Sequence, residues 1–96
     1  MRPSPDPLLR EAIGETIRDL RASEHLTLRQ VSGDAAISLG YLSEIERGQK
    51  EASSEVLALI ARALDVSVGE LMAEVADRLL AYEAQIVVPL AARLAA

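Results

Sequence analysis

Residues 38–50 read SLGYLSEIERGQK and predict a short helix with an unusual start. Ser38 is a good cap residue, and Leu39, Leu42 and Ile45 follow it at three-residue spacing. Leu42 and Ile45 are expected to face the core, and Leu39 to project outward. Gly48 ends the helix after about three turns. Gly40, however, lies in the first turn, where glycine costs about 1 kcal/mol relative to alanine. A bare backbone beside a polar outer face indicates a helix that lies against a large partner, and the partner we expect is DNA.

A second short helix precedes this one. Thr27 and Gln30 fit a capping box, in which the hydroxyl accepts from an early amide and the glutamine side chain reaches back. The helix then runs to about Ala35, and residues 36–37 form a tight turn before Ser38. Two capped helices whose caps lie eleven residues apart have the layout of a helix-turn-helix. The second helix has the length to enter a DNA major groove, which is about 12 Å wide.

The rest of the chain shows no strand signal and predicts an all-α fold of five helices followed by a C-terminal helix. One helix is expected over about residues 7–23, another from Ser53, and a further one behind a second capping box at residues 67–70. We divide the chain into three parts: a flexible arm at residues 1–7, a DNA-binding domain at residues 8–73, and a C-terminal dimerisation helix at residues 74–96, kinked or broken near Pro89.

The composition excludes several classes of protein. The 96 residues include no cysteine and one histidine, His25, so neither a disulfide nor a thiolate or histidine metal site is expected. No nucleophile–base pair, phosphate-binding loop or metal-ligand spacing is present in the sequence, so we expect neither an enzyme nor a cofactor. Residues 1–7 do not resemble a signal peptide, and the longest apolar stretch, residues 86–92, is too short to span a bilayer. We therefore expect a cytoplasmic, nucleoid-associated protein with no membrane partner.

The net charge of −5 counts against simple electrostatic binding to nucleic acid. The charge is unevenly distributed, because residues 1–50 hold seven Lys or Arg and eight Asp or Glu, whereas residues 51–96 hold three and seven. The front half is therefore nearly neutral and can still present a locally positive face.

The C-terminal part carries an apolar stripe close to a heptad seam. We expect a symmetric dimer interface through Val75, Leu79, Tyr82, Ile86 and Leu90. A single helix-turn-helix binds DNA weakly at cellular salt, because each phosphate contact contributes through counterion release. A homodimer on a palindromic operator overcomes this weakness by placing two recognition helices about 34 Å apart. The alternative is that this helix folds back onto its own domain.

Short strings spread over residues 17–72 carry a family resemblance. They are Leu20-Arg21, Leu26-Thr27, Val31, Ile37-Ser38, the run Tyr41-Leu42-Ser43-Glu44-Ile45-Glu46-Arg47-Gly48, and Ala63-Leu64-Asp65-Val66-Ser67. Together they resemble the Cro/repressor-type (XRE-like) helix-turn-helix transcriptional regulators. The strings SLGYLSE (residues 38–44) and ERGQKEASSE (residues 46–55) are more similar to one subgroup, the Clp gene regulators, which activate genes of ATP-dependent proteases.

The resemblance implies an ion pair between Arg21 and Glu46 that links the first helix to the end of the recognition helix. An arginine can engage a carboxylate through two parallel hydrogen bonds, which fixes register; the alternative is two independent surface charges. The chain departs from the family at two positions. Ala36 replaces the glycine usual in the turn, and alanine in a left-handed conformation costs about 1–2 kcal/mol, so the turn is open to another shape. Leu28 replaces a glutamine used on phosphate, which removes one expected backbone contact.

The candidate DNA contacts lie at the start of the second helix, along the third helix and just after it. They are Thr27, Arg29, Ser38, Leu39, Gly40, Tyr41, Ser43, Glu44, Arg47, Gln49 and Lys50. Ser43 and Glu44 are the candidate base readers, because serine suits donor or acceptor edges and a carboxylate accepts from cytosine N4. The phosphate contacts we expect are Arg29, Arg47, Gln49 and Lys50. For Glu44 the alternative is a carboxylate facing a nearby cation, and for Tyr41 it is plain packing.

We therefore expect a sequence-specific DNA-binding transcriptional regulator and, through the subgroup likeness, an activator of Clp protease and stress genes. Its expected partners are double-stranded DNA with a palindromic operator, a second copy of the chain, RNA polymerase and Clp protease. The protease is suggested by Leu94-Ala95-Ala96, which is similar to the small apolar tails that Clp-type proteases read; an ordinary frayed helix end is the alternative. The competing function is a protein-interaction module, antitoxin-like or adaptor, whose acidic C-terminal half suits a basic polypeptide.

Overall fold

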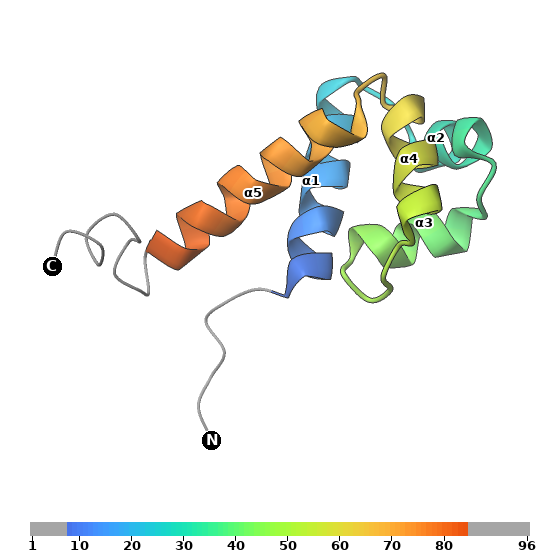
Figure 1. The fold of residues 1–96 in the computed structure, drawn as a ribbon. Helices are drawn as coiled ribbons and strands as arrows, with labels where there is room; N and C mark the ends of the chain where they lie inside the picture. Colours follow the sequence, from blue (N-terminus) through green and yellow to red (C-terminus); the bar gives the residue numbers. More distant parts are fainter. Residues whose placement is uncertain (1–7, 85–96) are drawn as a thin grey trace, which may run out of the picture.

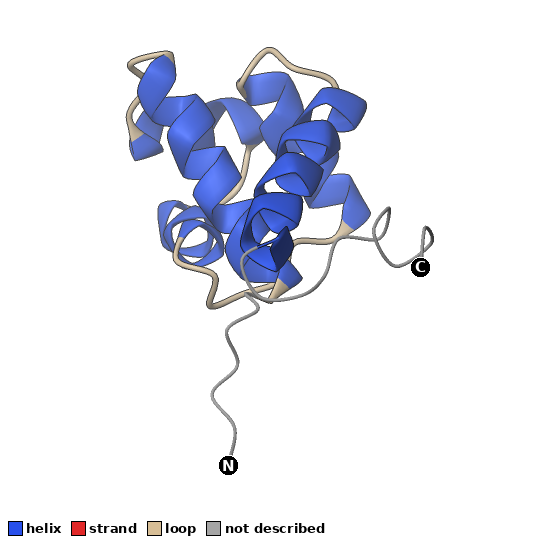
Figure 2. Cartoon of the chain, turned by 90° about the vertical axis from the view of Figure 1, so that its left-hand side faces the viewer, coloured by secondary structure: helices blue, strands red, loops and turns tan. Residues whose placement is uncertain are grey.

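The computed structural model describes residues 8–84, and this part of the chain forms five α-helices and no strand (Figure 1, Figure 2). The helices are α1 (Leu9–Ser23), α2 (Leu28–Ala35), α3 (Leu39–Glu46), α4 (Ser54–Ala63) and α5 (Val68–Ala84). The predicted all-α fold is confirmed. The expected boundary between residues 73 and 74 falls inside α5, so the fifth helix of the domain and the C-terminal helix are one continuous element up to residue 84. The arm at residues 1–7 and the expected break at Pro89 lie outside the described residues.

Hydroxyl groups start helices α2 to α5. The cap residues are Thr27, Ser38, Ser53 and Ser67, and each hydroxyl oxygen accepts a hydrogen bond from the backbone N–H three residues later at 3.0–3.1 Å. Two caps are reciprocal, because the side chains of Gln30 and Glu70 accept from the backbone N–H groups of Thr27 and Ser67 at 2.7 and 2.8 Å. Both capping boxes expected from the sequence are confirmed. Hydrogen bonds from the Ser67 backbone and hydroxyl lower the pKa of the Glu70 carboxyl.

Helices α1 to α4 each end at a residue in the left-handed conformation. These residues are His25, Ala36, Gly48 and Asp65, with φ between 57° and 72°. After each of them, the next backbone N–H donates to the carbonyl five residues back at 2.9–3.0 Å, which closes the helix end. The turn between α2 and α3 thus keeps a left-handed residue at Ala36, although alanine lacks the freedom of glycine there.

The core draws aliphatic side chains from every helix. Its fully buried members include Ile17, Val31, Leu42, Ile45, Ile60 and Leu71. Leu42 and Ile45 anchor α3 from its inner face, as the sequence spacing predicted. The opposite face of α3 is therefore free to meet another molecule.

A polar ladder holds α5 against α1. The Arg78 guanidinium donates to the Thr16 hydroxyl and to Glu15 Oε1, both at 3.2 Å, and also pairs with Asp19. Burial disfavours the charged form of Arg78, but its bonds and charge interactions with Asp19 and Glu15 outweigh this and raise its pKa. The Tyr82 hydroxyl donates to Glu15 Oε1 at 3.1 Å, one turn further along α5. These bonds fix the direction in which α5 leaves the domain, beside α1 in Figure 1.

The packing of α5 against its own domain involves residues of the predicted dimer seam. Val75 is only 2% exposed within the single chain, and Tyr82 is bonded to α1, so both side chains face their own domain. The alternative of a helix that folds back onto its domain therefore holds for this stretch. Leu79 is half-buried. Ile86 and Leu90 lie outside the described residues.

Candidate nucleic-acid interface

The outer face of α3 presents a bare strip of backbone. Leu39 is 37% exposed, Gly40 is exposed and Ser43 is half-buried. A Cβ atom added at Gly40 would have no protein atom within 4 Å. Nothing in the chain's own packing therefore requires glycine at this position, in contrast to a glycine that makes room for a neighbouring helix.

Polar side chains gather where α3 ends. The Arg47 guanidinium donates to the Ser43 hydroxyl, one turn back, and to Gln49 Oε1 at 3.3 Å. Arg47, Gln49 and Lys50 are all exposed. Glu44 is half-buried and takes part in none of the ion pairs found in residues 8–84. The end of α3 thus offers cations and amides for an anionic ligand.

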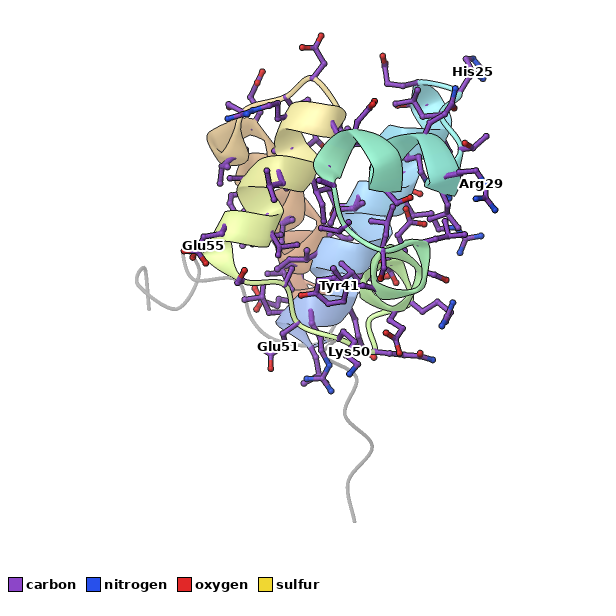
Figure 3. All side chains as sticks on the ribbon, turned by 90° about the vertical axis from the view of Figure 1, so that its right-hand side faces the viewer. His25, Arg29, Tyr41, Lys50, Glu51 and Glu55 are labelled. Carbon is purple, nitrogen blue, oxygen red and sulfur yellow. The ribbon has the colours of Figure 1, made fainter. Side chains whose placement is uncertain are left out.

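The start of α2 lies next to this region. Thr27 uses its hydroxyl as the cap of α2, and Arg29 is exposed. Leu28 is half-buried and packs on the core. In Figure 3 the side chains of Arg29 and Lys50 lie above and below α3, while Glu55 lies at the opposite edge of the view from Arg29. The cationic side chains of α2 and of the loop after α3 thus flank the recognition helix.

Tyr41 connects α3 to the loop before α4. It is half-buried against the core, and its hydroxyl donates to the Glu51 carbonyl oxygen at 3.1 Å (Figure 3). Within the free chain Tyr41 therefore packs as the alternative drawn from the sequence describes, and its contact with DNA stays a prediction. The bond to Glu51 also fixes the loop that carries Lys50.

Arg21 and Glu46 form a two-pronged ion pair between α1 and the last residue of α3. Arg21 Nε donates to Glu46 Oε2 at 2.8 Å and Arg21 Nη2 to Glu46 Oε1 at 3.0 Å. The third nitrogen donates to the Leu26 carbonyl at 2.9 Å, and the bonds to Glu46 raise the pKa of Arg21. The Glu46 side chain is 5% exposed and that of Arg21 17%. The pair is therefore a largely buried, bidentate ion pair that connects the two helices.

A hollow of about 270 Å³ lies where α1, the start of α2 and α3 meet. It is lined by Arg18, Arg21, Leu28, Ser43, Glu46 and Arg47. Arg18, an exposed cation one turn before Arg21, was not among the contacts predicted from the sequence. Its spacing of three residues from Arg21 was the available signal, because Arg21 was already expected to reach α3. Arg18 thus adds a cation to the edge of the recognition helix.

Two other kinds of site are not found in the described part of the chain. Residues 8–84 contain no group of three or more His, Cys, Asp or Glu side chains arranged to hold a metal ion. None of the five helices is both long and apolar enough to cross a membrane.

Taken together, two capped helices joined by a tight turn, with a polar and partly cationic outer face, define a helix-turn-helix DNA-binding domain. The chain belongs to the helix-turn-helix family: the family model described as "Helix-turn-helix" matches residues 17–71. It is a DNA-binding transcriptional regulator of the Cro/repressor type and not an enzyme.

Known proteins support this assignment. The transcriptional regulator ClgR of Mycobacterium tuberculosis is 46% identical over 76 residues, which are 79% of this chain and 68% of that protein. The crystal structure of the clp gene regulator ClgR from Corynebacterium glutamicum matches 83% of this chain and 85% of its own with a TM-score of 0.79 and 46% identity. The restriction-modification controller protein C.Esp1396I, solved as a tetramer with its natural 35-base-pair operator, is 25% identical, with a TM-score of 0.64 over 72% of this chain and 96% of its own. The resemblance to the Clp gene regulators seen in the sequence is thus confirmed.

Proposed function

We propose that this chain binds a palindromic operator as a homodimer and activates Clp protease and stress genes. The observation that carries the DNA-facing part of the proposal is the open space around Gly40, because a bare backbone that the fold does not need is suited to close approach by a ligand. The likeness to the two ClgR regulators supports the choice of target genes.

The contacts divide into two sets. Base edges are met by Leu39, Gly40, Ser43 and Glu44 on the outer face of α3. Phosphates are met by side chains around that helix: Arg18, Thr27, Arg29, Ser38, Arg47, Gln49 and Lys50. Tyr41 acts indirectly, through its bond to the loop of Lys50. Ser43 releases Arg47 on binding, since the two side chains are bonded to each other in the free chain.

The dimer surface on α5 is the face that its own domain leaves open. Leu80 is 61% exposed, the exposed Ala76 lies one turn before it, and the half-buried Leu79 lies beside it. A second chain that packs on this face buries apolar surface without disturbing the ladder to α1. Leu79 belongs to the seam predicted from the sequence; the other two members of that seam, Ile86 and Leu90, lie outside the described residues.

The remaining partners follow from activation and turnover. An activator contacts RNA polymerase at the promoter, and the C-terminal Leu94-Ala95-Ala96 is a candidate tail for Clp protease. Both interactions place the protein in the cytoplasm, at the nucleoid.

Selection of bound duplexes from a random DNA pool tests the function directly. A palindromic consensus is the expected result, and the dissociation constant for it is then measured across salt for the wild type and two variants. Arg47→Ala should weaken binding and reduce the salt slope by about 0.9, because one phosphate contact is lost. Arg62→Ala is the matched control, since it removes one exposed arginine from α4, and it should leave the slope unchanged. Salt-insensitive or absent DNA binding by the wild type contradicts the proposal and favours a protein-interaction module.

A further inference from the structure

One glycine of α1 lies directly beneath the end of the recognition helix. Gly14 is buried, and an ideal Cβ built on it would come within 2.2 Å of the Ile45 carbonyl oxygen and 2.7 Å of the Glu46 carbonyl oxygen. Both obstacles are backbone atoms, so no side chain can rotate away to make room. The fold therefore requires a residue without a side chain at position 14, which is not the case at Gly40.

Neighbouring residues of α1 support the same end of α3. Arg10 Nε donates to the Gly48 carbonyl at 3.1 Å. A Cβ at Gly48 would lie 3.0 Å from the Glu11 Cα, which shows how closely α1 approaches the residue that ends α3. Together with Arg21, positions 10 and 14 lie on one stripe of α1, at helical spacing. The C-terminal end of α3 therefore rests on α1 at several levels, with Gly14 at the tightest one.

This support fixes where the last turn of α3 stands. A methyl group at position 14 must increase its distance to the Ile45 oxygen from 2.2 Å to beyond 3.0 Å, a movement of at least about 0.8 Å. Ser43 and Arg47 belong to the turn that would be displaced. We propose that Gly14 is a positioning residue that sets the sequence specificity of DNA binding by fixing the seat of α3, an inference that rests on the proposed function.

Base contacts and phosphate contacts respond differently to such a displacement. A bidentate contact to a base edge depends on placement and discriminates between bases by about 5- to 150-fold. Contacts to phosphate come from long, adaptable side chains and act largely through charge, so they tolerate a shift of this size. A displaced α3 therefore loses affinity for the selected operator while it keeps its affinity for unrelated duplex DNA.

The test compares the full chain with Gly14→Ala and with Gly69→Ala, a control on α5 where an added Cβ meets only the Ser67 hydroxyl at 3.8 Å. Urea unfolding first establishes that each variant is folded. Dissociation constants for the selected operator and for a scrambled duplex are then measured across salt. For Gly14→Ala the specificity ratio, which is the dissociation constant for the scrambled duplex divided by that for the operator, should fall about tenfold or more with the salt slope unchanged. Gly69→Ala should match the wild-type ratio. A folded Gly14→Ala protein with the wild-type ratio overturns the proposal, because it shows that Gly14 serves packing alone.

A second variant decides the matter if Gly14→Ala does not fold. Arg10→Ala removes the hydrogen bond to Gly48 without adding bulk, and it should lower the specificity ratio while the salt slope stays the same. An unchanged ratio, or a slope reduced by about 0.9 that marks Arg10 as a phosphate contact, overturns the positioning role. A wild-type chain that does not discriminate between the two duplexes rejects the proposed function itself, and that result is distinct from either outcome.

Discussion

The substitution Gly40→Ala should have opposite effects on the stability of the fold and on DNA binding by α3. Gly40 and Gly69 occupy equivalent places, since each is the second helical residue after a serine cap, Ser38 or Ser67. A Cβ meets nothing within 4 Å at Gly40 and only one hydroxyl at 3.8 Å at Gly69. Alanine at either position is therefore free of strain in the isolated chain, and the two variants differ in which surface receives the methyl group.

The magnitudes follow from this geometry. Alanine is favoured over glycine by about 1 kcal/mol inside a helix, and we expect about half of that in the first turn. Both variants should thus unfold at a slightly higher temperature, by about 2–4 °C for a domain of this size. If the strip around Gly40 lies against the duplex, the added methyl overpacks that contact and costs about 1–3 kcal/mol of binding free energy. This corresponds to operator binding that is about 5- to 150-fold weaker for Gly40→Ala alone.

Thermal unfolding and titration of the selected operator measure the two effects on the same samples. The expected pattern is a gain in stability for both variants and a loss of DNA affinity for Gly40→Ala only. Wild-type affinity in Gly40→Ala would show that the strip faces solvent in the complex, and the assignment of the base-reading face would then be wrong. Equal losses in both variants would show an indirect effect through the fold.

Other predictions concern the turn, the ion pair, the hollow and the second capping box. Ala36→Gly should raise the free energy of unfolding in urea by about 0.5–1 kcal/mol, because glycine adopts the left-handed conformation without the Cβ clash but gains entropy when unfolded. Glu46→Gln should lower it by about 2 kcal/mol, less than for a fully buried pair because the Arg21 side chain is 17% exposed and still reaches water. Arg18→Ala should reduce the salt slope of operator binding by about 0.9 without changing stability. The pKa of Glu70 is lowered in the folded chain, so its stabilising contribution is present above pH about 4.5 and is lost as the pH falls further; relative to Glu70→Gln, the wild type should lose stability in that acidic range in urea titrations.

The starts of α2 to α5 could be predicted from their cap residues, but the left-handed conformation that follows most of the helices could not. A cap is a local hydrogen bond between a hydroxyl and an amide three residues away, so the residue types at that spacing are enough to predict it. Of the four left-handed end residues only Gly48 carries the usual signal. His25 and Asp65 belong to types that adopt this conformation more readily than most, whereas Ala36 does so because the packing of α2 and α3 outweighs its local preference.

The face of α3 was also predictable, because the spacing of Leu42 and Ile45 determines which side turns inward. The contribution of α1 to the candidate site could not be predicted from the sequence. Gly14 has its role only because the end of α3 passes within contact distance of it, and Arg18 lines the hollow for the same reason. The close approach of the two helices depends on tertiary packing, and no local sequence pattern in α1 indicates it.

The stripe on α5 shows that a spacing pattern does not identify what packs on the face. A heptad-like spacing indicates that a face is buried, and it does not say which chain buries it. Arg78 lies on this stripe between Val75 and Tyr82, and a charge there needs partners of opposite sign. Since Glu15 and Asp19 stand four residues apart on α1, the same chain supplies both partners and the face closes internally. In the proposed homodimer the second copy packs on the exposed side that carries Leu80. Leu80→Glu should therefore shift the chain toward monomer in sedimentation, whereas Val75→Ala should chiefly lower the stability of the fold. If Val75→Ala caused the dimer to dissociate while the chain stayed folded, the dimer interface would instead be the seam predicted from the sequence, which includes Val75.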